Sequence, residues 1–177
     1  METNGLLFVG IAIALLGAGG GTGRTDVGKP GALTANALPQ VYAAEIGVRE
    51  ATGNNDGPRV VAYLRYCGLA EGYEWCAAFV SWCHGQAGYP GPRNAWAAAL
   101  FPSERTVWAK AGATAGGTPR AGDVFGIYIA SKKRIGHCGF VDGWNGKWCI
   151  TVEGNVSNAV VRKRRPVRTI HAVSRWH

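Results

Sequence analysis

Residues 74–80 read Glu-Trp-Cys-Ala-Ala-Phe-Val, and apolar positions continue beyond them at helical spacing. The positions i, i+3, i+4, i+7 and i+11 are apolar and would form one stripe on a helix: Cys76, Phe79, Val80, Cys83 and Ala87. The stripe ends at Gly88 and Pro90, which commonly stop helices. The sequence therefore predicts a helix that begins with Cys76 and carries this cysteine on its buried face.

A cysteine on the first turn of a helix is a candidate nucleophile. The unpaired amides and the positive end of the helix dipole favour a thiolate there, and they also favour any oxyanion that forms beside it. Trp75 is expected to pack beside the sulfur and to restrict water. A carboxylate next to the thiol would raise its pKa, so we expect Glu74 to point away or to meet a cation such as Arg93. A cysteine alone is more often a small buried residue, so the assignment depends on partners.

Two alternating stretches near the C-terminus supply candidate partners. Residues 136–143 read Gly-His-Cys-Gly-Phe-Val-Asp-Gly, and residues 147–155 read Lys-Trp-Cys-Ile-Thr-Val-Glu-Gly-Asn. Trp-Asn-Gly at 144–146 separates them, which predicts a β-hairpin.

The turn length decides which side chains of the hairpin face each other. A three-residue turn with Gly146 left-handed pairs residue 143 with 147, and it places His137 directly across from Glu153. A two-residue Asn-Gly turn slips the register by one and moves Glu153 to the other face. We favour the three-residue turn because it also gathers a core on the opposite face, made of Cys138, Phe140, Ile150 and Val152.

Taken in order, these stretches resemble the cysteine, histidine-dependent amidohydrolase/peptidase (CHAP) family of peptidoglycan hydrolases. Pro-Arg-Ala-Gly-Asp-Val at 119–124 resembles the turn that enters the sheet in that family, and the resemblance covers roughly residues 38–176. Related NlpC-type peptidases usually carry Asp-Cys-Ser around the nucleophile, so Trp-Cys-Ala disfavours them. The resemblance implies four site residues: Cys76 as nucleophile, His137 as general base, Glu153 as its orienter and Asn155 as a further polar member.

The implied fold is α+β and papain-like (CHAP/NlpC-like), with N-terminal helices followed by an antiparallel sheet of about five to six strands. The local patterns agree, because helices followed by strands favour α+β over a parallel sheet. Besides the Cys76 helix and the hairpin, helices are predicted at 39–50, 58–67 and 103–112, and strands at 123–129, 159–164 and 168–176.

The implied activity is hydrolysis of an amide bond in peptidoglycan through a thioester on Cys76. The resemblance leaves open whether that bond is the N-acetylmuramoyl-L-alanine bond or a peptide bond. A catalytically silent cell-wall-binding module on the same fold is the alternative. We expect no cofactor and no metal, because no Cys-x-x-Cys spacing occurs and the loop at Asp56 has one carboxylate where calcium prefers several.

The remaining cysteines and histidines have simpler interpretations. The five cysteines are an odd number, so at least one is free. Cys76 and Cys83 are two helical turns apart, about 10.5 Å of rise, and cannot bridge each other. Cys83 and Cys138 are interpreted as small buried hydrophobes. Three further histidines are interpreted as surface residues: His84, His171 and His177.

The N-terminus has a different character from the rest of the 177 residues. Residues 5–18 are apolar and uncharged, but Glu2 replaces the usual basic flank of a secretory signal, and a stable anchor needs about 20 residues. We predict a signal or anchor at 1–20 that contacts the membrane, a Gly/Thr-rich linker at 21–37, and one hydrolase domain at 38–177. The expected location is therefore extracytoplasmic, at the cell envelope.

Charge indicates an anionic partner. The chain has 19 Lys and Arg against 11 Asp and Glu, a formal net charge of +8. Envelope polymers that carry carboxylates or phosphates fit this charge, with an attraction that weakens in salt. Binding to nucleic acid is not expected, because the sequence has no recognised nucleic-acid-binding module. The protein is expected to be a monomer. Basic residues cluster near the C-terminus: Arg162, Lys163, Arg164, Arg165 and Arg168.

Overall fold

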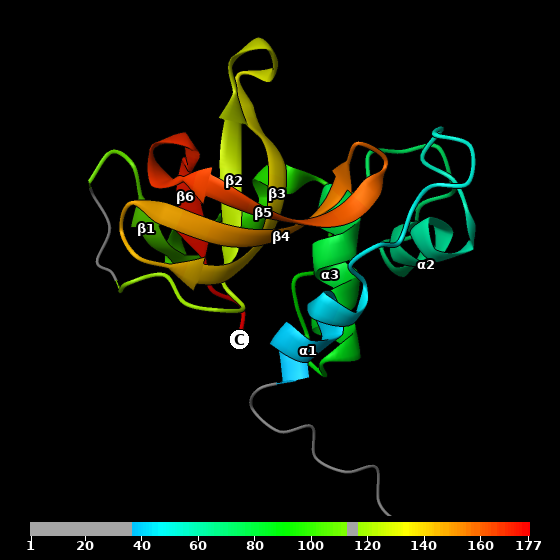
Figure 1. Ribbon diagram of the computed structural model, residues 1–177, viewed down its shortest axis with the longest axis horizontal. Coiled ribbons are helices and arrows are strands. Elements are labelled where there is room, and N and C mark those ends of the chain that lie inside the picture. Colours follow the sequence, from blue (N-terminus) through cyan, green and yellow to red (C-terminus); the bar gives the residue numbers. More distant parts are fainter. Residues whose placement is uncertain (1–36, 113–116) are drawn as a thin grey trace, which may run out of the picture. The chain divides into compact units, whose positions relative to one another are not determined.

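The computed structural model describes residues 37–112 and 117–177 (Figure 1). The predicted signal or anchor at 1–20 and all but the last residue of the predicted linker at 21–37 lie outside these residues. The described α-helices precede most of the sheet: α1 (Ala37–Ala44), α2 (Pro58–Tyr66) and α3 (Cys76–Gln86). Within the described residues, no helix is both long enough and apolar enough to cross a membrane.

The strands form one antiparallel sheet of six in the described part of the chain, in the order β1-β6-β2-β3-β4-β5. This confirms the predicted α+β class and the sheet of five to six strands. The strands are β1 (Thr106–Ala109), β2 (Val124–Ile129), β3 (Arg134–Trp144), β4 (Trp148–Val156), β5 (Ala159–Pro166) and β6 (Ala172–Ser174). Short 3₁₀ turns lie at Ala97–Leu100, Ser103–Arg105, Ala130–Lys132 and Val167–Thr169.

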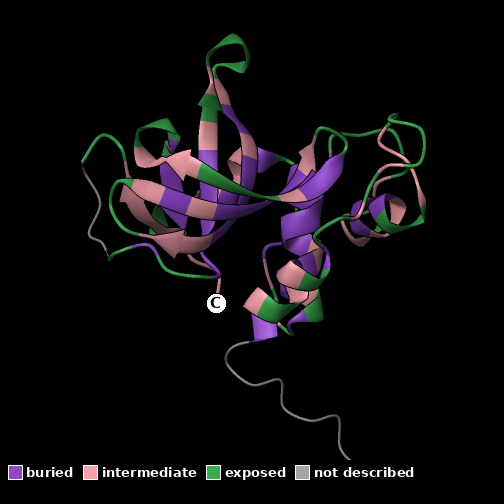
Figure 2. Ribbon diagram, viewed as in Figure 1, coloured by how far each residue is buried: buried purple, intermediate pink, exposed green. Residues whose placement is uncertain are grey.

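Helix α3 packs against β3 and β4 and is buried along most of its length (Figures 1 and 2). Its close approach to β4 requires a glycine at position 154. A Cβ atom there would lie 2.7 Å from the Trp75 ring and 2.9 Å from Cβ of Phe79. The glycine between Glu153 and Asn155 therefore lets the start of α3 touch the sheet, which places Cys76 beside it.

Both faces of the sheet are covered. On the helical face, Phe140 stacks on Tyr42 of α1 with centroids 4.5 Å apart and meets Phe79 of α3 edge-on at 5.8 Å. These aromatic contacts fix α1 and α3 to β3. The other face has a smaller apolar cluster of residues that alternate with the first set: Phe125, Val141, Cys149, Ile170 and Val173.

The helix predicted at 39–50 ends early, at Ala44. Gly47 adopts a φ of 98°, and its N–H donates to the Val160 carbonyl at 3.0 Å. Arg49 then forms an isolated bridge with Ala159. Pairing with β5 thus overrides the helical pattern after residue 44, whereas α2 and α3 lie where the sequence predicts them.

The helix predicted at 103–112 is also wrong. Only Ser103–Arg105 is helical, as a single 3₁₀ turn, and Thr106–Ala109 forms β1. The cause is distant in sequence, because Thr106 pairs with Ser174 of β6. The strand predicted at 168–176 is correspondingly shorter, since β6 covers only Ala172–Ser174.

The hairpin register differs from the prediction by two residues. Phe140 pairs with Val152, and a bulge between Val141 and Gly143 then brings Trp144 opposite Cys149. The turn is closed by Asn145, whose side-chain oxygen accepts from the N–H of Trp148 at 2.7 Å and of Lys147 at 3.1 Å. A shift of two preserves the faces, so His137 and Glu153 still share one face without being directly opposite. Three of the four predicted core residues are buried, and Ile150 is half-buried.

Candidate active site

Cys76 is the first residue of α3, and its side chain is almost completely buried. The first helical hydrogen bond runs from the Phe79 N–H to the Trp75 carbonyl at 2.8 Å. The N–H groups of residues 76–78 therefore have no partner within the helix, as at any helix start. Trp75 is fully buried in front of the cysteine, and its indole N–H donates to Glu50 at 2.8 Å.

His137 lies on β3 and contacts the buried carboxylate of Glu153, with Nε2 at 2.8 Å from Oε2. Two further side chains hold that carboxylate. Arg165 donates from Nε to Oε1 at 2.6 Å and from Nη2 to Oε2 at 2.5 Å, and Thr151 donates its hydroxyl to Oε1 at 2.5 Å. Burial alone would raise the pKa of Glu153, but the hydrogen bonds from Arg165, His137 and Thr151 lower it to about 2. Glu153 is therefore a fixed anion behind the imidazole.

The thiol and the imidazole shift each other's protonation. A hydrogen bond from Cys138 lowers the pKa of Cys76, burial opposes this, and the hydrogen bond and charge of His137 lower the pKa further, well below the ordinary thiol value. Burial would lower the pKa of His137, but hydrogen bonds to Cys76 and Glu153 raise it to about 9. Both shifts favour the thiolate–imidazolium pair over the neutral thiol and imidazole. Because Nε2 faces Glu153, Nδ1 is the nitrogen available to the sulfur.

Cys138 was predicted to be a small buried hydrophobe, and it is fully buried. Its contact with Cys76 was not predicted. The hydrogen bond to Cys76, followed by burial, raises the pKa of Cys138 well above the ordinary thiol value. These shifts favour a protonated Cys138 beside a Cys76 thiolate. The alternation of β3 was a usable signal, because it turns residue 138, like Phe140, toward the face that α3 covers.

Asn155 borders the site but does not join the hydrogen-bonded chain. It lines a pocket of about 260 Å³ together with Cys76 and His137. Its amide is best satisfied with the nitrogen toward Glu50 at 3.3 Å and the oxygen toward the Trp75 N–H at 3.2 Å. The structure thus brings Cys76, His137 and Glu153 into one chain of contacts and places Asn155 at the start of α3.

Thr151 and Arg165 are the site residues that sequence reasoning missed. Arg165 was grouped with the basic cluster, but it forms an ion pair with Glu153, and Arg162 pairs with Asp142 at 3.1 Å. Only the pairing of β5 with β4 shows which basic residues turn inward. Within the described residues, the exposed cations on and after β5 that have no ion pair are Lys163, Arg164 and Arg168.

Glu74 meets a cation, as expected, but the cation is Lys132 and not Arg93. Lys132 Nζ lies 2.6 and 2.8 Å from the two carboxylate oxygens. Arg93 instead donates from Nε to the Tyr66 carbonyl at 2.8 Å. Lys132 therefore balances the carboxylate of Glu74, two residues before Cys76.

The surface interpretation of the histidines is wrong for His84 and holds for His171. His84 is fully buried, because α3 has almost no solvent-facing side. Burial lowers the pKa of His84 to about 4, and its Nδ1 lies 2.9 Å from the Val80 carbonyl. The His177 side chain is largely buried and lies 4.0 Å from Asp123.

All five cysteines are free thiols. In the part of the chain that the structure describes, no three His, Cys, Asp or Glu side chains are grouped so that they could hold a metal ion.

Comparison with known proteins decides the family. Residues 68–155 match the family model described as the CHAP domain. The chain contains a CHAP domain. The matched stretch runs from the end of α2 to the end of β4, and it includes all four predicted site residues.

Solved structures with a similar arrangement are only distantly related. One is "The crystal structure of Ly7917", 16% identical with a TM-score of 0.45, covering 78% of this chain and 61% of that chain. Another is "The crystal structure of Ly7917 with the hydrolyzing product of MDP", 16% identical with a TM-score of 0.46, covering 80% and 62%. The chain thus spans about three fifths of the length of those structures. No curated protein matches it.

Proposed function

We propose that this protein is a peptidoglycan hydrolase that cleaves an amide bond through a thioester on Cys76. The observation that carries the proposal is the chain of contacts from Cys76 through His137 to the buried Glu153, in which thiolate and imidazolium are favoured together. The CHAP domain supports the substrate class. A merely structural cysteine would gain nothing from an oriented imidazole and a buried anion behind it.

The reaction follows from the protonation states. The Cys76 thiolate attacks the amide carbonyl carbon, and the oxyanion that forms is bound by the free N–H groups at the start of α3. The His137 imidazolium gives its proton to the departing amine, and the C–N bond breaks to leave a thioester. Water then attacks the thioester while the neutral His137 accepts its proton. The C–S bond breaks, the carboxylic acid product leaves, and the thiolate–imidazolium pair is restored.

Glu153 and Arg165 are proposed as positioning residues. Neither contacts the thiol, but Glu153 fixes the imidazole by its hydrogen bond to Nε2, and Arg165 keeps Glu153 ionised. Asn155 is proposed to act on the helix start, through the Trp75 N–H, and not on the imidazole.

The location and the wider partners also remain proposals. Peptidoglycan lies outside the cytoplasm, so we propose that the enzyme acts at the envelope, with residues 5–18 directing it there. The exposed cations Lys163, Arg164 and Arg168 support attraction to anionic envelope polymers, which should weaken as salt rises.

The test is the release of fragments from purified peptidoglycan by the full chain and by a Cys76→Ala variant. We expect the variant to fold, judged by its thermal unfolding, and to release no fragments. Cys149→Ala is the matched control, because Cys149 is equally buried but belongs to the apolar cluster on the other face. Undiminished release by Cys76→Ala would overturn the mechanism, and binding without release by the unmodified protein would favour a silent wall-binding module.

A further inference from the structure

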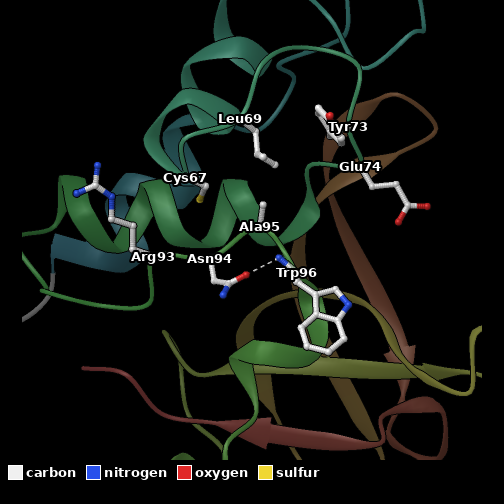
Figure 3. Close-up of a pocket in the computed structure, with 8 residues that line it drawn as sticks. All are labelled: Cys67, Leu69, Tyr73, Glu74, Arg93, Asn94, Ala95 and Trp96. Carbon is white, nitrogen blue, oxygen red and sulfur yellow. Dashed lines mark hydrogen bonds between the residues drawn. The ribbon is translucent and has the colours of Figure 1, made fainter.

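A second hollow, of about 460 Å³, adjoins the pocket of Cys76 and His137 (Figure 3). Glu74 lines both spaces, and it lies two residues before Cys76. One wall is the loop between α2 and α3, which contributes Leu69 and Tyr73, and the other is the loop of residues 93–96 after α3. The hollow and the pocket of Cys76 therefore meet at Glu74.

Two exposed aromatic rings face this hollow. Tyr73 is 56% exposed and Trp96 is 55% exposed. The described residues contain four exposed large hydrophobic side chains, and the two most exposed of them line this one hollow. Figure 3 shows that Tyr73 and Trp96 come from opposite walls. Exposed apolar surface gathered at a concave place commonly marks a binding site.

The wall that carries Trp96 is held in place by contacts within the protein. The Asn94 backbone is fixed to α3, because it donates to the Ser81 hydroxyl at 3.0 Å and its carbonyl accepts from that hydroxyl at 2.8 Å. The Asn94 side-chain oxygen accepts from the Trp96 N–H at 2.8 Å, and the Arg134 guanidinium lies 5.6 Å from the Trp96 ring centre. Trp96 is thus presented by a fixed turn, which reduces the entropy lost on binding.

The chemistry of the hollow fits a sugar ring better than a peptide strand. Pyranose rings have faces of C–H groups that stack on aromatic rings, and their hydroxyl and N-acetyl groups need hydrogen-bond partners at the rim. Asn94 has a side-chain nitrogen that donates to no acceptor within the described residues, and Glu74 offers carboxylate oxygens. Both walls are loops, so neither offers the strand edge that extended peptides pair with.

We propose that Tyr73 and Trp96 form a saccharide subsite that binds an N-acetylhexosamine ring of the glycan strand. This inference rests on the proposed function and makes it more specific. A sugar held beside Glu74 brings the amide attached to that sugar to Cys76. The bond cleaved is then the N-acetylmuramoyl-L-alanine bond, with hydrolysis giving a lactyl carboxylate on the sugar and a free amino group on L-alanine.

The binding test uses the full chain with Cys76→Ala, so that no turnover is needed. Chitotetraose is added while the indole N–H signals are followed by NMR. We expect the Trp96 signal to move, and Trp96→Ala and Tyr73→Ala each to weaken binding by about tenfold. Tyr128→Ala is the matched control, because Tyr128 is 46% exposed on β2 and does not line the hollow, and it should bind normally.

The subsite is overturned if chitotetraose leaves Trp96 unmoved, or if a sugar-free stem peptide moves it and chitotetraose does not. A separate readout tests the bond. New amino termini in a peptidoglycan digest should be L-alanine, and termini at other residues alone would overturn the bond assignment. If the unmodified protein does not hydrolyse peptidoglycan, the NMR binding result still stands. The saccharide subsite and the proposed hydrolase function can therefore be refuted independently of each other.

Discussion

Replacing Arg165 by leucine should destabilise the protein far more than the same change one residue earlier, at Arg164. Arg165 makes two hydrogen bonds to a carboxylate that is fully buried, and its own side chain is only 20% exposed. The surroundings lower the pKa of Glu153 from its ordinary value of 4.5 to about 2, which corresponds to roughly 3 kcal/mol of favourable interaction with the ionised form. Arg165 contributes the largest favourable part, and leaving a buried charge unpaired commonly costs a similar amount, roughly 3–5 kcal/mol.

The assay is thermal unfolding, followed across pH. For a domain of this size we expect Arg165→Leu to lower Tm by roughly 10 °C at pH 7. Because the pKa of Glu153 is lowered by folding, its stabilisation is present above pH 4.5 and is lost as pH falls toward 2. In the variant the pKa of Glu153 rises toward or above its ordinary value, so this loss of stability at low pH should shrink or reverse.

Arg164→Leu is the control, because Arg164 is exposed and stacks on Trp148 at 4.0 Å, a contact that contributes roughly 0.5–1 kcal/mol. The variant at 165 should also lose activity, because Arg165 no longer holds the carboxylate that orients the His137 ring. Equal Tm values for the two variants, or undiminished activity of Arg165→Leu, would refute the positioning role of Arg165.

Three further predictions follow from the same geometry. Iodoacetamide should label Cys76 with a pH midpoint below the roughly 8.5 of an ordinary thiol, and a midpoint at or above that value would contradict a stabilised thiolate. Asn155→Ala should lower kcat by less than roughly threefold in steady-state assays, because Asn155 does not contact the imidazole. Glu153→Gln should lower kcat by roughly 100-fold or more, because Glu153 contacts His137 directly. Similar losses in the two variants would argue against assigning the orientation of His137 to Glu153 and not to Asn155. Gly154→Ala should lower the free energy of unfolding in denaturant by about 1–3 kcal/mol, because the added methyl group meets α3. Gly143→Ala is the control and should be nearly neutral, because a Cβ there would lie at an ordinary 3.6 Å from Ile150. Comparable losses of stability would show that α3 does not need this close approach to β4.

Local signals predicted the parts of the fold that depend on local interactions. The start of α3 at Cys76 follows from an apolar stripe closed by glycine and proline, and the common face of His137 and Glu153 survives any even shift of register. The hairpin pairing itself was wrong, because the Asn145 side chain closes the turn and a bulge follows it. Neither feature has a distinct signal in the alternation of apolar residues.

The remaining errors involve partners that are distant in the sequence. The segment after Ala44 has a helical pattern, yet it pairs with β5, more than a hundred residues later. Arg165 looked like one member of a basic cluster, because only the pairing of β5 with β4 distinguishes an inward arginine from its exposed neighbours. Asn155 is a similar case. The sequence motif predicts that it belongs to the site, but its hydrogen-bond partners come from the α1–α2 loop and the start of α3, which are distant in the sequence.

The buried site balances its charges at each step of the proposed reaction. In the proposed resting state the charges alternate from the Cys76 thiolate to the His137 imidazolium, the Glu153 carboxylate and the Arg165 guanidinium. Acylation removes the first two together, because the thiolate becomes a thioester while the imidazolium gives its proton to the leaving amine. Glu153 and Arg165 still neutralise each other, so no buried charge is left unpaired. This balance gives Arg165 a role in a site where only the thiol and the imidazole are proposed to react. Without Arg165, the thioester stage would hold the buried Glu153 anion beside a neutral histidine. Glu153 would then compete with His137 for the proton that the next step needs.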